Sequence, residues 1–174
     1  MGRLVLVPPG REHEEQVMAY RRAFLEAGSD FDGCAGLKET ETYGEWLDFE
    51  GRALRKHGKD AVPSLVFLAM REGTLVGILE IRMKLTDFLL RFGGNIGYSV
   101  LPKERGQGYA KEMLALALEE CRKLGMEKVL VNCDPENIPS AKTIQANGGV
   151  LENEVEDTVG LTKSGIIQRY WVTL

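Results

Sequence analysis

A short turn with closely spaced glycines is the part of the sequence best suited to chemistry. It reads Arg105-Gly106-Gln107-Gly108-Tyr109-Ala110 and stands between an apolar stretch and a long amphipathic one. Glycine lets the main chain turn tightly and approach a ligand closely. The free N–H groups of a first helical turn point at such a ligand, with the positive end of the helix dipole behind them. The turn is therefore a candidate binding site for a phosphate or pyrophosphate group.

The stretches on either side of the turn predict a strand and a helix that hold it in place. Every second residue is apolar from Ile96 to Val100, so residues 95–101 are expected to form a strand that ends before Pro102. After Gly108 the apolar residues recur at the spacing of a helix that buries one face. They are Ala110, Met113, Leu114, Ala117, Leu118, Cys121 and Leu124.

The turn does not match two other phosphate-binding motifs. It lacks the G-K-[ST] of a P-loop, and Lys111 stands where a dinucleotide-binding fingerprint has its third glycine. The pattern R-x-x-G-x-A is loose when taken alone. The sequence that follows strengthens it, because an apolar strand at 128–133 leads to Asn137, Ala141 and Gly148.

Together these segments resemble the acyl-CoA-binding core of the GNAT superfamily of N-acetyltransferases. The family signature [RQ]-x-x-G-x-[GA] lies between the fourth strand and the third helix, and Arg105, Gly108 and Ala110 fill it. The later residues fit the family's N-x-x-[SA]-A…G segment. The resemblance implies an α/β fold of the α+β type, with about four helices around a mixed, mostly antiparallel sheet splayed between its fourth and fifth strands. It also implies one acetyltransferase domain spanning residues 1–174.

The resemblance assigns the turn and its neighbours to an acetyl-CoA co-substrate. The turn would hold the pyrophosphate through main-chain N–H groups, and it comprises Arg105, Gly106, Gln107, Gly108, Tyr109 and Ala110. Tyr98, Ser99 and Val100 would pair with the pantetheine arm, and a main-chain N–H near Val100 would polarise the thioester carbonyl. Asn137 would hydrogen-bond the arm from the other side. Its alternative role is to cap the following helix, and the two roles are compatible.

The sequence departs from the family at the general acid. Many members place a tyrosine seven residues after the asparagine, where its hydroxyl protonates the departing thiolate, but here that position is Ile144. No nearby residue of that helix has an acidic proton to give. A CoA thiolate is stable enough to leave without much help at neutral pH, so either another residue or solvent supplies the proton.

Two more residues are candidates for the transfer step itself. Glu80 is expected to be the general base, acting on the acceptor amine directly or through water. The alternative is that Glu80 and Arg82, two apart on one strand, face solvent or pair with each other. Cys133 would lie near the thioester and offers a covalent acyl-cysteine route. Because Asp134 would raise its pKa, a packed and inert cysteine is the favoured interpretation.

The acceptor is expected to be a primary amine. In the family, the first two helices and the loop between them form one wall of its site, and here that loop at 28–36 is glycine-rich and contains Asp30 and Asp32. Either one of these carboxylates orients a cationic substrate, or both are solvated turn residues. A small polyamine, an amino acid, an antibiotic and a protein N-terminus all remain open. No metal constellation is visible in the sequence, so no metal is expected.

Composition and charge limit the class of protein. A chain of 174 residues with 44% hydrophobic and 28% charged residues suits one soluble domain with a single core. Its net charge of −4 argues against binding to nucleic acid, which needs a basic face. Three cysteines without metal-ligand spacing fit a reducing compartment, and the apolar run at 4–7 is too short for a signal peptide or a membrane span. A cytoplasmic protein is expected.

The rest of the chain predicts elements around this core. Residues 85–94 are expected to connect two strands with a short turn of helix, and the C-terminal strand at 167–174 is a candidate for pairing two copies into a homodimer. Helices are predicted at 12–27, 42–57 and 138–146, and strands at 3–7, 64–70, 75–83, 128–133, 150–155 and 166–174.

Two rival functions remain open at this point. A protein of the same fold that binds or senses acyl-CoA but transfers little is supported by the missing tyrosine. An unrelated α/β phosphate-binding protein would bind nucleotides without preferring CoA. Release of CoA in the presence of a primary amine distinguishes an enzyme from the first rival, and a preference for CoA over nucleotides excludes the second.

Overall fold

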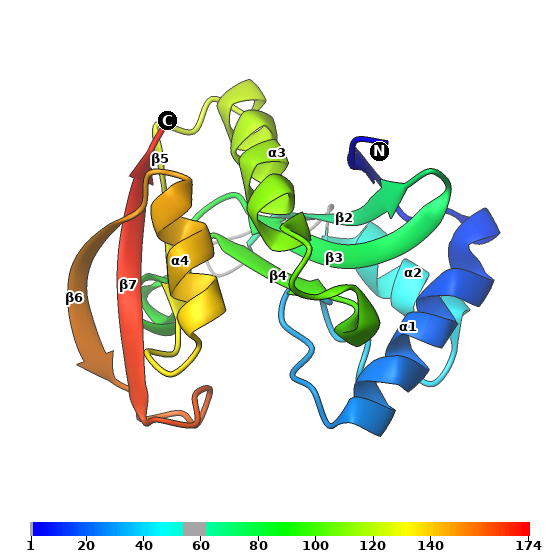
Figure 1. Cartoon of the computed structure of the whole chain (residues 1–174), viewed down its shortest axis with the longest axis horizontal. Coiled ribbons are helices and arrows are strands. Elements are labelled where there is room, and N and C mark those ends of the chain that lie inside the picture. Colours follow the sequence, from blue (N-terminus) through cyan, green and yellow to red (C-terminus); the bar gives the residue numbers. More distant parts are fainter. Residues whose placement is uncertain (1, 54–61) are drawn as a thin grey trace.

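The strands of the computed structural model, which describes residues 2–53 and 62–174, divide between two antiparallel sheets (Figure 1). The first sheet has the order β1 (Val5–Val7), β2 (Ser64–Arg71), β3 (Thr74–Arg82), β4 (Ile96–Val100). The second has the order β5 (Lys128–Cys133), β7 (Ile166–Thr173), β6 (Val150–Glu156). The predicted fold, a mostly antiparallel sheet split between its fourth and fifth strands, is confirmed.

The order of the second sheet corrects one prediction. Strand β7 lies between β5 and β6, so that Trp171 pairs with Leu130 on one side and with Val150 on the other. Both edges of the C-terminal strand are therefore occupied, and the prediction that it pairs two copies of the chain is wrong. The outer edge of this sheet belongs to β6, most of whose side chains are exposed.

The helices cover the two faces of the sheets. In Figure 1, α3 (Tyr109–Lys123) and α4 (Ile138–Ala146) lie in front of the strands, and α1 (Glu14–Ala27) and α2 (Tyr43–Ala53) lie at the right. The short 3-10 turns η1 (Arg11–His13) and η3 (Pro102–Glu104) precede α1 and α3. The predicted extension of α2 to His57 lies outside the described residues. In the described part of the chain, no helix combines the length and apolar character needed to cross a membrane.

Each helical layer has its own apolar core, which follows from the alternation of side chains along the strands. The core under α3 and α4 includes Met113, Leu114, Ala117, Ile144, Leu79, Ile81, Ile96, Val129 and Val131. The core under α1 and α2 includes Val17, Tyr20, Phe24, Trp46, Val66, Leu68 and Ile78. Successive residues of β3, Ile78 and Leu79, thus enter opposite cores, and the two sheets share the first one.

The loop between α1 and α2 is fastened to β4. Gly28 ends α1 in the left-handed conformation, and the indole Nε1 of buried Trp46 donates to the Cys34 carbonyl oxygen (2.9 Å). Gly33 then lies against Gly97 of β4, so closely that a Cβ on Gly33 would come within 2.3 Å of the Gly97 oxygen. Only glycine allows this backbone-to-backbone approach. The loop therefore places Asp32 directly beside β4.

The connector between β3 and β4 is held by an arginine from each sheet. It contains the π-helical turn η2 (Leu89–Gly93), which confirms the predicted short helical turn. Arg82 Nη1 donates to the carbonyl oxygens of Gly93 (3.1 Å) and Gly94 (3.3 Å). Arg169 of β7 donates through Nε and Nη2 to the Leu90 carbonyl oxygen, at 3.0 and 2.8 Å. The connector thus ties the first sheet to the second.

Candidate active site

The two sheets meet at one point and separate from there. Asn95 N donates to the Leu130 oxygen (2.7 Å), and Asn95 Oδ1 accepts from Leu130 N (2.8 Å). The same side chain donates through Nδ2 to the Arg82 oxygen (2.9 Å), so it links three strands. In the described residues no further main-chain hydrogen bond joins β4 to β5, and the strands separate toward Val100 and Cys133. This splay exposes main-chain groups of both strands.

At the open end of the splay, the turn before α3 presents a row of N–H groups. Gly106 and Gly108 adopt positive φ angles of 77° and 83°, which glycine tolerates best. In the described part of the chain, none of the main-chain N–H groups of residues 106–111 donates to another residue. A Cβ added to either glycine would meet no atom within 4 Å, so the space over the turn is open. Such a concave row at a helix N-terminus suits an anion.

The side chains of the turn point elsewhere. Arg105 Nε donates to the Val100 carbonyl oxygen (3.1 Å), and its guanidinium lies over the Phe24 ring. Gln107 Nε2 donates to a Glu104 carboxylate oxygen (3.1 Å). Tyr109 is buried in the core beneath α3. Arg105, Gln107 and Tyr109 therefore stabilise the shape of the turn, and the groups it offers to a ligand belong to the main chain.

Strand β4 presents different residues to its two neighbours. Asn95 and Leu101 bond to β3 through their main chains, and Ser99 lies opposite Ile78 in the same register. Because these bonds alternate along an antiparallel strand, the main-chain groups of Tyr98 and Val100 face the splay. The Val100 oxygen is taken by Arg105.

The Ser99 side chain lies on the face of β4 that α1 covers. Its hydroxyl contacts the Tyr20 hydroxyl (2.9 Å) and Cys34 Sγ (3.3 Å). Burial raises the pKa of Cys34 to about 12, so this thiol stays protonated at neutral pH. The structure thus separates Ser99 from Tyr98 and Val100, and it uses Ser99 to fasten α1 and the following loop to β4.

A pair of hydroxyl groups on the other face was not predicted from the sequence. The Tyr98 hydroxyl lies 3.0 Å from Ser140 Oγ, and this contact joins β4 to α4 across the splay. Burial raises the pKa of Tyr98 to about 12, and the hydrogen bond to Ser140 opposes that rise. Ile144, at the family's usual tyrosine position, is fully buried in the core. A phenol therefore does reach this helix, but it comes from a strand distant in sequence.

Two other residues near α4 have the structural roles considered from the sequence. Asn137 caps the helix, because its Oδ1 accepts from Ser140 N (3.2 Å), and the predicted capping role is confirmed. Cys133 is buried at the end of β5, and burial raises the pKa of its thiol to about 11. A thiol that stays protonated at neutral pH is a poor nucleophile. This agrees with the interpretation of Cys133 as a packed cysteine.

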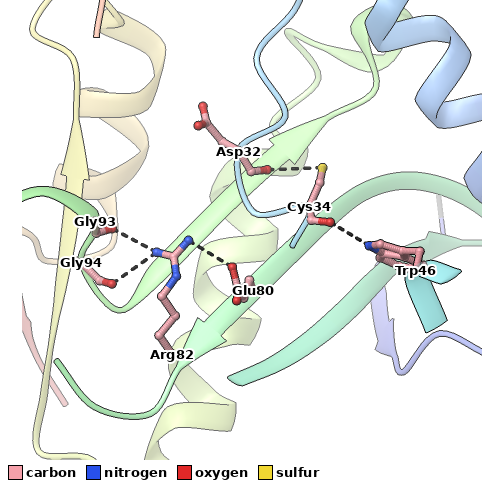
Figure 2. A network of polar contacts seen from close by, with 7 residues as sticks. All are labelled: Asp32, Cys34, Trp46, Glu80, Arg82, Gly93 and Gly94. Atoms are coloured by element: carbon pink, nitrogen blue, oxygen red, sulfur yellow. Dashed lines mark hydrogen bonds and ion pairs between the residues drawn. The ribbon is translucent and has the colours of Figure 1, made fainter. Parts of the chain in front are cut away.

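On the face covered by α1 and α2, carboxylates gather beside the splay. Glu80 Oε2 and Arg82 Nη2 of β3 form an ion pair at 3.0 Å, with side chains 13% and 22% exposed. Pairing, one of the predicted alternatives, is confirmed, and the alternative in which both side chains face solvent is wrong. Figure 2 shows this pair below the loop that carries Asp32 and Cys34, with the Asp32 carboxylate pointing away from Cys34.

Asp32 is exposed to solvent, and the pKa of its carboxyl group is raised. Although the residue is exposed, the surrounding protein desolvates its carboxylate enough to raise the pKa of Asp32. The nearby charge of Asp30 raises that pKa further, and Arg82 lowers it. A carboxylate of increased basicity that solvent can reach is suited to accept a proton.

An open cleft adjoins this face on the side of the second sheet. Its volume is about 390 Å³, and it is lined by Asp87, Leu90, Arg91, Val155 and Arg169. It lies between the connector and the β6–β7 hairpin. Within residues 2–53 and 62–174, no three His, Cys, Asp or Glu side chains are grouped so as to hold a metal ion.

Comparison with known proteins matches residues 3–150 to the family model of the acetyltransferase (GNAT) domain. No curated protein matches the chain. Many solved structures share the fold, among them the microcin C7 self-immunity acetyltransferase MccE in complex with acetyl-CoA and AMP. That structure has a TM-score of 0.70 and 14% sequence identity, over 99% of this chain and 93% of the other.

Two further structures are of acetyltransferases with a named acceptor. The dodecameric spermidine N-acetyltransferase of Vibrio cholerae has a TM-score of 0.69 and 14% identity, over 98% of this chain and 94% of the other. An acetyltransferase of Salmonella typhimurium that modifies the N-terminal serine of ribosomal protein L7/L12 has a TM-score of 0.66 and 16% identity, over 99% and 95%. At these identities the likeness establishes the fold alone.

Proposed function

This chain belongs to the acetyltransferase (GNAT) domain family, and we propose that it moves an acetyl group from acetyl-CoA to a primary amine by direct transfer. We take residues 1–174 as one such domain. The observation that carries the proposal is the row of free N–H groups at residues 106–111, placed at the open end of the splay between β4 and β5. The three free cysteines, all buried, fit the proposed cytoplasmic location.

The residues present fit acetyl-CoA, which supplies an activated acetyl thioester when it is bound. The N–H groups of residues 106–111 would hold its pyrophosphate, and the open space over Gly106 and Gly108 leaves room for it. The main-chain groups of Tyr98 and Val100 would pair with the pantetheine arm, with the Val100 N–H available to polarise the thioester carbonyl. The proposal does not use Ser99, whose main chain bonds to β3.

On the acceptor side, the proposal assigns proton acceptance to Asp32. Glu80, the base expected from the sequence, is engaged by Arg82, so taking up a proton there would weaken a half-buried ion pair. Asp32 has the raised pKa and the contact with solvent that a general base needs. Glu80 would instead hold Arg82, which in turn fixes the connector.

The bonds and protons of the proposed transfer balance. A C–N bond would replace the C–S bond of the thioester, and the amine proton would pass to the Asp32 carboxylate directly or through water. On the opposite face, the hydroxyl pair of Tyr98 and Ser140 would donate a hydrogen bond to the departing thiolate. The thiolate would then take its proton from solvent, because a phenol with a pKa of about 12 is a weaker acid than the thiol that forms. This arrangement supplies the donor that Ile144 cannot.

The experiment that tests the proposal measures acetylated product by mass spectrometry. The wild-type protein is incubated with acetyl-CoA and one amine at a time, spermidine in one reaction and alaninamide in another. Amine-dependent release of CoA with a matching acetylated amine is expected. Binding of acetyl-CoA without release for either amine would favour the alternative of an acyl-CoA-binding or sensing protein. Failure to bind acetyl-CoA would overturn both.

A further inference from the structure

The side-chain amide of Asn132 is buried and lacks a partner. Within the described residues, Asn132 Nδ2 and Oδ1 are the buried side-chain nitrogen and oxygen atoms that make no hydrogen bond. Buried amides are nearly always hydrogen-bonded, because leaving both ends unpaired away from water is unfavourable. An exception in a native fold calls for an explanation, and a ligand that satisfies the amide is one.

The position of Asn132 in β5 places it at the splay. The Leu174 N–H donates to the oxygen of Glu127, the residue just before β5. In an antiparallel pair every second residue bonds to the partner strand, so the odd-numbered residues of β5 bond to β7 through their main chains. The main chains of Leu130 and Asn132 therefore face β4, as the two bonds between Leu130 and Asn95 show directly. The Asn132 main chain thus borders the splay just beyond its closed end.

The Asn132 side chain lies on the acceptor face. Its neighbours along the strand, Val131 and Cys133, enter the core under α3 and α4, so Asn132 points to the opposite face. There it stands opposite Arg169, which lines the 390 Å³ cleft. On the other side of the splay, the same face presents Glu80, and Gly97 beside it carries no side chain.

We propose that the Asn132 amide binds the acceptor at its reactive end and selects an amine that has a carbonyl oxygen next to it. This inference rests on the proposed transferase function. A carboxamide offers one acceptor and one donor side by side. Oδ1 would accept an N–H of the amine, and Nδ2 would donate to the neighbouring carbonyl oxygen. An α-amine of an amino acid or peptide has both groups, whereas a protonated polyamine has no hydrogen-bond acceptor. The cleft beside Arg169 would take the rest of the acceptor.

The experiment compares two amines and two proteins. Alaninamide has an α-amine beside a carbonyl, and isopropylamine replaces that carboxamide by a methyl group. Both are assayed with the wild type and with Asn132→Leu, whose side chain has nearly the same volume. We expect kcat/KM to fall at least about tenfold more for alaninamide than for isopropylamine, because isopropylamine loses only the contact with Oδ1 and alaninamide loses both contacts. For each amine, the variant is compared with the wild type, so the difference in basicity between the two amines does not affect the result.

Two controls separate recognition from a structural role. Asn132→Leu is expected to keep the acetyl-CoA affinity and to retain or raise the melting temperature, since it removes an unpaired buried amide. Gln145→Leu removes an amide of similar kind from the exposed surface of α4, away from the cleft, and should leave both amines unaffected. Equal losses for both amines, or a lower melting temperature together with weaker acetyl-CoA binding in Asn132→Leu, would overturn the proposal.

A binding measurement decides the inference even if no transfer is detected. The side-chain NH₂ signal of Asn132, identified by its disappearance in Asn132→Leu, is followed by ¹⁵N NMR in the presence of CoA. A larger shift of this signal with alaninamide than with isopropylamine supports the proposal. An unchanged signal with both amines rejects it, independently of whether the protein proves to be an enzyme.

Discussion

The two sides of the splay, the proposed cofactor side and the proposed acceptor side, present different kinds of group. On the cofactor side, the turn at 106–111 offers main-chain N–H groups, while the side chains of Arg105 and Gln107 bond within the protein. On the acceptor side, the groups belong to side chains, foremost Asp32 and Asn132. A main-chain site depends on backbone angles and open space, so many substitutions should leave it intact. A side-chain site depends on the identity of each residue.

The largest expected effect comes from filling the main-chain site. Gly108→Trp places an indole in the open space over the turn, and we expect the Kd for acetyl-CoA to rise by about 100-fold or more, since the pyrophosphate contacts are lost together. Isothermal titration calorimetry measures this. Gly125→Trp is the matched control at the other end of α3, because Gly125 has a φ of 77° and equally open surroundings. Equal losses in both variants would show that backbone strain, not the cradle, is responsible.

Removing the proposed base should affect turnover and leave the cofactor site unchanged. Asp32→Asn is expected to lower kcat/KM for the amine by about 10²-fold, with the Kd for acetyl-CoA unaltered. The acid limb of the pH–rate profile, set by the raised pKa of Asp32, should disappear. Glu80→Gln is the comparison, and it should reduce stability more than turnover because it breaks the pair with Arg82. A larger loss of turnover in Glu80→Gln would return the role of base to Glu80.

The raised pKa of Asp32 also predicts the direction in which Asp32→Asn changes the stability of the protein. A raised pKa means that the folded state holds the proton of Asp32 more tightly than the unfolded chain does. Ionisation therefore costs stability as pH rises from the unfolded pKa through the folded one, and that cost persists at neutral pH. Asp32→Asn removes it, so its melting temperature at pH 7 should not fall below that of the wild type. A clear decrease would mean that the carboxylate supports the fold.

A smaller effect is expected at the hydroxyl pair. Tyr98→Phe removes one hydroxyl and keeps the ring, so kcat should fall by about tenfold while the Kd for acetyl-CoA changes little. Ser140→Ala should give a similar loss, and the double variant should lose no more than either single variant if the two hydroxyls act together. Additive losses would show that they act separately. Stopped-flow or steady-state kinetics with one amine suffices.

The smallest effect is expected for Cys133→Ala. The pKa of about 11 that burial gives this thiol leaves almost no thiolate at neutral pH, so direct transfer should proceed within about twofold of the wild-type rate. Detection of an acetylated Cys133 by mass spectrometry, together with loss of turnover in the alanine variant, would instead establish the covalent route.

The difference between the two sides also explains what could be predicted from the sequence. The turn, α4 and β5 follow from local patterns, namely glycine spacing, a proline early in the helix and short-range alternation. No local pattern shows that β7 lies between β5 and β6. The prediction that the C-terminal strand pairs two copies of the chain is wrong for this reason.

The side-chain site depends on such long-range pairing. Tyr98 meets Ser140 only because α4 folds over the splay, and Asn132 lies beside Arg169 only because of the pairing of β5 with β7. Asp32 and Glu80 differ in environment, which residue type alone does not reveal. The elements that form the turn are therefore easier to predict here than the side-chain contacts across the splay.

The most direct test of the central claim is to titrate ¹⁵N-labelled protein with acetyl-CoA and follow each main-chain amide by NMR. The largest shifts are predicted for residues 106–111, with further shifts at Tyr98 and Val100 and little change at Gly125. Binding that leaves the amides of 106–111 unshifted would contradict the account, because the main-chain cradle would then not be where the cofactor binds.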